Sequence, residues 1–74
     1  MQLSMDPKFP GYHPDNWELD ITIWLDGIQQ LRAVAVDTVK GVCVVYTPAH
    51  GYVEAKGKVE VKNHLGKVIT KFNP

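Results

Sequence analysis

The sequence has little of what disulfide-stabilised, catalytic and membrane proteins need. Its single cysteine excludes an internal disulfide, and Cys43 in a β-rich run is typical of a small buried hydrophobe. Ser4 is the only serine, so a Ser-His-Asp arrangement has no credible nucleophile. No stretch approaches the roughly 18 apolar residues of a membrane helix, and the N-terminus lacks the basic-then-apolar layout of a signal peptide. We expect a cytoplasmic protein, or part of a particle assembled there, with no membrane partner.

The residues that carry chemistry are scattered along the chain. His13, His50 and His64 lie in three separate turns or loops and form no paired metal-ligand motif with one another. Glu18 and Asp20 alternate on one strand face without an apolar pocket, so they read as solvent-facing carboxylates and not as an acid/base pair. No glycine-rich phosphate loop is present. We predict no catalytic residue, no metal site, no cofactor and no enzyme activity.

A chain of 74 residues with 45% hydrophobic side chains fits one small globular domain. Three of its five prolines fall in residues 1–16, which show no apolar periodicity. We expect these residues to form an irregular proline-rich N-terminal arm with at most a short helical turn, contributing little to the core, and residues 17–74 to form the β domain. A core from so few residues is thin, so we also expect self-association.

Alternating side chains predict the first strand and hairpin. Apolar side chains at Trp17, Leu19, Ile21 and Ile23 alternate with polar ones, which indicates a strand with one wet face. Asp26-Gly27 is a strong hairpin signal. A two-residue turn would bring Gln30 and Arg32 opposite the isoleucines, so burial favours a three-residue loop, 25–27, with positive φ at Gly27.

Two further strands, 31–36 and 42–46, are apolar on both faces and are expected at the centre of a sheet. Residues 47–51 contain proline and glycine and are expected to break the ladder. A last hairpin is expected around the turn 63–66, with Lys62 opposite Lys67. The prediction is an all-β fold, a small antiparallel meander of about five strands that forms a compact barrel or a curled sheet.

Charge is unevenly distributed although the total is zero. The net charge is −4 over residues 1–27, +1 over 28–53 and +3 over 54–74. The expected register places the lysines of the last hairpin on one face: Lys56, Lys58, Lys62, Lys67 and Lys71. Three interpretations stay open: a solvated face that discourages edge aggregation, a partner for the acidic first strand within or between subunits, and a nucleic-acid-binding face.

Trp24 is expected on the face of the first strand that carries polar residues. It either covers Val34 or Val36, or it anchors a protein interface together with Phe9 and Tyr12 from the arm. Proline-rich arms can lie along a neighbouring protein as extended peptide. Phe9, Tyr12 and Trp24 are therefore the candidate protein interface.

The order of strands and turns resembles small proteins encoded by tailed bacteriophages. The resemblance covers roughly residues 19–72, and its most specific elements are Asp26-Gly27, the turn 37–41 and Gly66-Lys67-Val68. It implies a viral accessory or structural role. The first hypothesis is therefore a non-enzymatic module acting through protein contacts or self-assembly. The alternatives are nucleic-acid binding through the lysine face and a host-directed inhibitor.

Overall fold

The computed structural model describes residues 1–70, which form two antiparallel four-stranded sheets. The first sheet has the order β1 (Gln2–Ser4), β4 (Ala33–Asp37), β5 (Val42–Thr47), β6 (Gly51–Lys56). The second sheet has the order β3 (Ile28–Gln29), β2 (Ile21–Leu25), β7 (Val59–Asn63), β8 (Val68–Ile69). The described part of the chain has one helical element, the 3₁₀ helix η1 (Asn16–Glu18). The all-β prediction is confirmed, whereas the single meander of about five strands is wrong.

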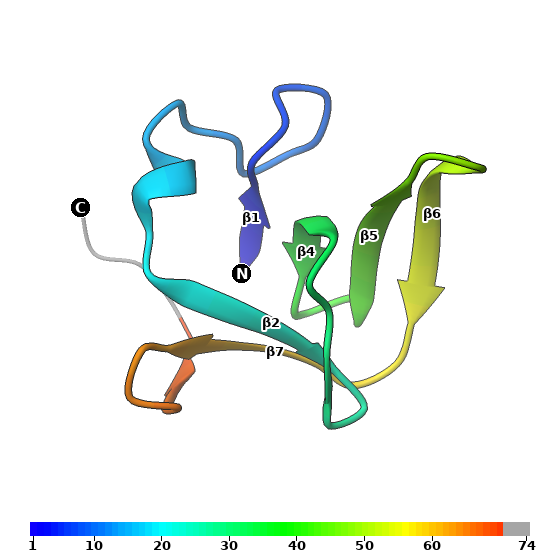
Figure 1. The fold of residues 1–74 in the computed structure, drawn as a ribbon. Helices are drawn as coiled ribbons and strands as arrows, with labels where there is room; N and C mark the ends of the chain where they lie inside the picture. The colour runs from blue at the N-terminus through cyan, green and yellow to red at the C-terminus, as the bar shows by residue number, and fades with distance from the viewer. Residues whose placement is uncertain (71–74) are drawn as a thin grey trace.

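The core lies between the two sheets. Figure 1 shows β2 and β7 running across the direction of β4, β5 and β6. The buried side chains that pack together come from both sheets: Leu3, Ile23, Val36, Cys43, Val59 and Val61. Burial raises the pKa of the Cys43 thiol, which keeps this sulfur in its neutral, unreactive form. The cysteine is thus a core residue, as its position in an apolar strand predicts.

The first hairpin differs from the prediction in its register. Trp24 pairs with Gln29 and Leu25 with Ile28, so the loop is the two-residue turn Asp26-Gly27, with φ of 50° and 79°. The positive φ at Gly27 is confirmed, but the three-residue loop is wrong. The reason is that β3 ends at Gln29 and the chain then crosses to the other sheet. Gln30 still lies opposite Ile23, and its N–H donates to the Ile23 carbonyl oxygen at 2.8 Å. The unfavourable pairing of Arg32 with the core face of β2 does not arise, because the chain has left the sheet by then.

The two central strands are confirmed as β4 and β5, but two later expectations are wrong. Residues 47–51 do not end the ladder; they form the turn of a β5–β6 hairpin in which Thr47 pairs with Gly51. In the last hairpin Lys62 pairs with Val68 and not with Lys67. Asn63 explains this shift, because its Oδ1 accepts hydrogen bonds from the backbone N–H groups of Leu65 and Lys67 and holds Lys67 in the turn.

The N-terminal segment is more ordered than expected. Gln2–Ser4 forms β1, which pairs with β4, and Leu3 is buried in the core. The expectation that residues 1–16 contribute little is wrong in this part. The three prolines of residues 1–16 all lie after β1, at positions 7, 10 and 14, so residues 2–4 are free to join a sheet.

Candidate functional site

A hollow of about 340 Å³ opens between η1, β2 and the start of β4. Polar atoms make up about half of the lining surface, although seven of the nine lining residues are apolar and two are glutamines: Met5, Trp17, Leu19, Ile21, Ile23, Gln29, Gln30, Leu31 and Ala33. Gln29 ends β3, and Gln30 lies in the link to β4. Because Ile23 belongs to the core, the hollow reaches from the surface to the space between the two sheets. We call this feature the apolar groove.

Two large apolar side chains of the groove stand in solvent. Trp17 is 73% exposed and Leu31 is 86% exposed. The sequence predicts Trp17 on the buried face of a strand, and that prediction is wrong because residues 16–18 form a 3₁₀ turn. The run Pro14-Asp15-Asn16 before the tryptophan is typical of turns and was the signal for this. Exposed tryptophan is characteristic of contact surfaces.

Asn16 holds η1 and therefore the groove in place. Its side chain is almost fully buried, and its Nδ2 donates to the backbone carbonyl oxygens of Ser4 at 2.8 Å and Gly11 at 3.0 Å. Gly11 has φ of 85°, and a Cβ there would lie 2.5 Å from the carbonyl carbon of Gln2. The turn carrying Trp17 is thus fixed to β1 by contacts that allow little substitution.

The charges beside the groove are mainly negative. Asp15, Glu18 and Asp20 are exposed and flank Trp17 and Leu19 in the chain. The opposite side has Arg32, also exposed, next to Leu31. This arrangement favours an apolar group that carries positive charge on the side facing η1.

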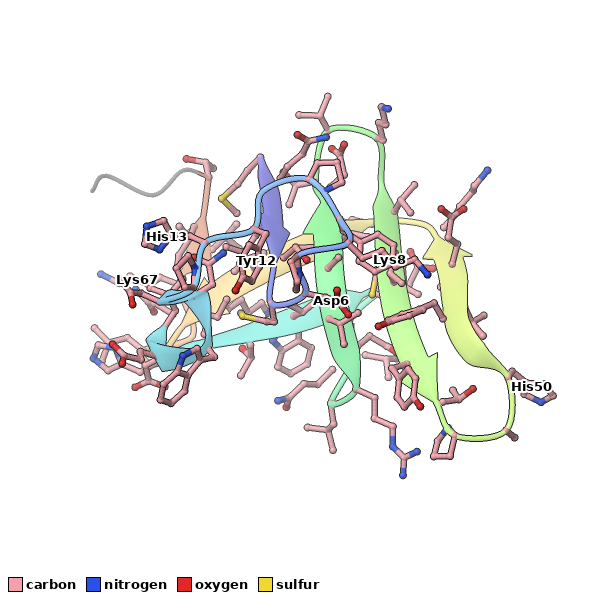
Figure 2. All side chains as sticks on the ribbon, turned by 90° about the horizontal axis from the view of Figure 1, so that it is seen from above. Asp6, Lys8, Tyr12, His13, His50 and Lys67 are labelled. Carbon is pink, nitrogen blue, oxygen red and sulfur yellow. The ribbon has the colours of Figure 1, made fainter. Side chains whose placement is uncertain are left out.

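The predicted interface residues Phe9, Tyr12 and Trp24 do not come together. Phe9 lies on the first sheet, where its ring meets that of Tyr52 edge to face at 5.2 Å between centroids. Tyr12 is exposed and forms a bridge with Ser4 beside β1; Figure 2 shows it on that side of the molecule.

Trp24 points to the outer side of the second sheet, as predicted, but it covers neither Val34 nor Val36. Its indole N–H donates to Thr22 Oγ1 at 2.9 Å. The Nζ of Lys62 lies 4.2 Å from the centre of its ring, a cation–π contact. Trp24 is therefore half-buried and engaged within its own sheet.

The predicted lysine face is divided between different elements. Lys56 ends β6 in the first sheet, Lys58 lies in the link to β7, and Lys62 belongs to β7 in the second sheet. Lys67 lies in the turn before β8, and Figure 2 shows it at the opposite end of the molecule from His50, which lies at the tip of the β5–β6 hairpin. Lys71 lies outside the described residues. The single lysine-rich face is wrong for the four lysines described, and anion binding by any of them stays a prediction.

A polar and aromatic cluster fastens the loop after β1 to the first sheet. The Tyr52 hydroxyl donates a short hydrogen bond to Asp6, and the Nζ of Lys8 lies 4.8 Å from the centre of the Tyr52 ring. Figure 2 shows Asp6 and Lys8 above this sheet. The hydrogen bond from Tyr52, helped by the Lys8 backbone N–H, lowers the pKa of Asp6, and the same bond raises the pKa of Tyr52. We call Asp6, Lys8, Phe9 and Tyr52 the arm cluster.

Within residues 1–70, no three His, Cys, Asp or Glu side chains lie close enough together to hold a metal ion. Over the same range there is no helix long and apolar enough to cross a membrane. Comparison with protein-family models gave no match, and neither curated proteins nor solved structures gave one.

Proposed function

We propose that the chain is a non-enzymatic protein-binding module that holds a short segment of another protein in the apolar groove. The exposure of Trp17 and Leu31 on the two sides of a hollow that reaches the core carries this proposal. Contact centres are enriched in aromatic anchors that are seated in pockets and surrounded by polar residues. The groove offers an exposed tryptophan beside a hollow, with exposed charged residues next to it in the chain.

The charges beside the groove define the partner further. A segment with one large apolar side chain could place it between Trp17 and Leu31, in contact with Ile21. Lysine or arginine next to that side chain would face Glu18 and Asp20, which adds favourable electrostatics and a faster association rate. We propose a phage accessory or structural protein in the host cytoplasm or the virion as the setting, on the strength of the strand-and-turn resemblance.

The test selects ligands from a displayed library of random 12-residue peptides. Peptides retained by the wild-type chain should combine a large apolar residue with adjacent lysine or arginine. Trp17→Ala and Leu31→Ala should each weaken their binding by about tenfold or more, because each removes an anchor side chain.

The matched control is Leu65→Ala. Leu65 is also strongly exposed, at 68%, but it lies in the β7–β8 turn and does not line the groove. This variant should bind the selected peptides like the wild type. Equal losses in the Leu31 and Leu65 variants, or selected peptides with no basic residues, would contradict the proposed site.

A further inference from the structure

The two sheets have four edge strands, and they differ in how far they are open to another strand. As described, β3 and β8 have two residues each. β1 has three residues and is covered at Ser4, whose N–H donates to the Gly11 carbonyl oxygen at 3.2 Å. β6 has six residues, Gly51–Lys56, and it contains no proline. Natural proteins usually protect an edge of this length, because it presents unpaired backbone groups to other chains.

The hydrogen bonds of the neighbouring strand β5 show which backbone N–H and C=O groups of β6 point outward. The Tyr46 N–H donates to the Arg32 carbonyl oxygen at 3.1 Å, so Tyr46 faces β4. Tyr52 is paired with Tyr46 and therefore turns its own N–H and C=O away from β5. The alternation of an antiparallel ladder then directs the same groups of Glu54 and Lys56 to the open edge.

The charged side chains of β6 match those of a second copy of the same strand in one antiparallel register. If two copies of the strand meet with Ala55 on the symmetry axis, Glu54 of each copy lies opposite Lys56 of the other. Both residues use outward-facing backbone groups, so they form hydrogen-bonded pairs with opposite charges. A register centred on Glu54 would instead set two carboxylates against each other.

The apolar side of β6 fits the same arrangement. Val53 is 40% exposed although it pairs with Val45, which packs against the core. A second copy of β6 would extend the sheet over this edge, where the proposed register sets Ala55 opposite Ala55 and Val53 opposite Gly57 of the other copy. Burial of such surface favours association, because it removes apolar area from water.

We propose that two copies of this chain pair antiparallel through β6 about a two-fold axis at Ala55. The dimer has one continuous sheet to which each copy contributes its four strands, and the interface uses the same surface of both copies. β6 and η1 lie at opposite ends of the molecule in both Figures 1 and 2. The pairing therefore leaves both apolar grooves accessible, and the dimer presents two of them.

Charge reversal on the full chain tests this interface and its register. The mass in solution should be twice the 8.3 kDa of one chain, measured by light scattering during size-exclusion chromatography. Glu54→Lys and Lys56→Glu should each raise the dimer dissociation constant by about tenfold or more, because each change places like charges opposite one another at both symmetric positions. The double variant with both changes restores opposite charges and should be dimeric again.

Each result supports or overturns the proposal. A monomeric wild type at millimolar concentration overturns it, and so does a double variant that stays as weak as the single ones. Single variants that remain fully dimeric also overturn it. Circular dichroism of each variant shows that a lost dimer is not a lost fold. Trp17→Ala should leave the mass unchanged, so failure of the dimer and failure of the groove are separate results.

Discussion

Phe9 and Trp17 are both aromatic residues of the N-terminal segment, but the structure uses them in opposite ways. Phe9 is folded back onto the first sheet, where its ring packs edge to face against the ring of Tyr52. Trp17 is held out into solvent by a turn that Asn16 fixes to β1. The difference shows that the local hydrogen bonds of the chain decide whether an aromatic side chain packs on the sheet or stays exposed. Beside Trp17, these are the hydrogen bonds that Asn16 makes to Ser4 and Gly11.

Gly11→Ala should have the largest effect, because Gly11 lies against β1 and accepts a hydrogen bond from Asn16. Phe9 and Trp17 lie on either side of this position in the chain. The left-handed backbone costs an alanine about 1–2 kcal/mol, and the added methyl would meet the backbone of Gln2. We expect the free energy of unfolding to fall by about 2 kcal/mol or more, measured by urea denaturation. Gly66→Ala is the control, since Gly66 has φ of 79° but nothing within 4 Å of the added Cβ. Equal losses in the two variants would show that the contact with Gln2 is unimportant.

Asn16→Ala should follow, with a loss of about 1–2 kcal/mol in the free energy of unfolding, because two carbonyl oxygens lose a buried donor. It should also weaken peptide binding in the groove, since Trp17 is no longer held in position. Urea denaturation and a peptide titration on the same variant measure the two effects. Unchanged peptide affinity would mean that Trp17 is positioned by other contacts.

Phe9→Ala and Trp17→Ala make the comparison directly. Loss of the edge-to-face pair with Tyr52 should cost about 0.5–1.5 kcal/mol beyond the lost burial. Truncation of the exposed Trp17 should change stability by no more than about 0.5 kcal/mol. Thermal melts give the stability of both variants, and peptide titrations should show the reverse order of effects. If Trp17→Ala is the more destabilising, the tryptophan is a packing residue and the groove loses its main argument.

Asp6→Asn should have the smallest effect, and that effect depends on pH. The pKa of Asp6 is lowered in the folded chain by the hydrogen bonds from Tyr52 and Lys8, from an ordinary value of 3.8. Its contribution is therefore present above pH 3.8 and is lost as the pH falls through the lowered value. The wild type should be the more stable protein at pH 6, and the difference should disappear in strong acid. Melting temperatures of the wild type and Asp6→Asn, measured from pH 6 down to strong acid, test this prediction. A stability difference that persists at the lowest pH would show that it comes from packing and not from the charge of Asp6.

The strands from Ala33 to Thr47 could be predicted because several local signals agree. Two apolar runs are separated by a turn with glycine, and any fold that buries them must make them central. The register of the first hairpin could not be predicted in the same way. The argument from burial assumed a long partner for β2, whereas β3 ends at Gln29 and the last backbone hydrogen bond to β2 comes from Gln30.

The groove was missed because the alternation from Trp17 to Ile23 fits a strand, but only its second half pairs with another strand. Two contacts that exclude Trp17 from the strand join residues distant in the chain, Asn16 with Ser4 and β1 with β4, and a third joins Asn16 to Gly11, five residues away. No local pattern reports such contacts. A turn signal is present at Pro14-Asp15-Asn16, but it competes with the longer period-two pattern that follows it.

The sequence by itself determined that the chain is all-β, that Cys43 is a core residue and that Gly27 needs a left-handed backbone, because strand alternation, apolar runs and turn chemistry are local. Only the tertiary structure decided that the strands divide into two sheets, that Trp17 stands outside the core and that β6 is an open edge. These features depend on which distant segments pair, and pairing is set by the burial and hydrogen bonding of the whole chain.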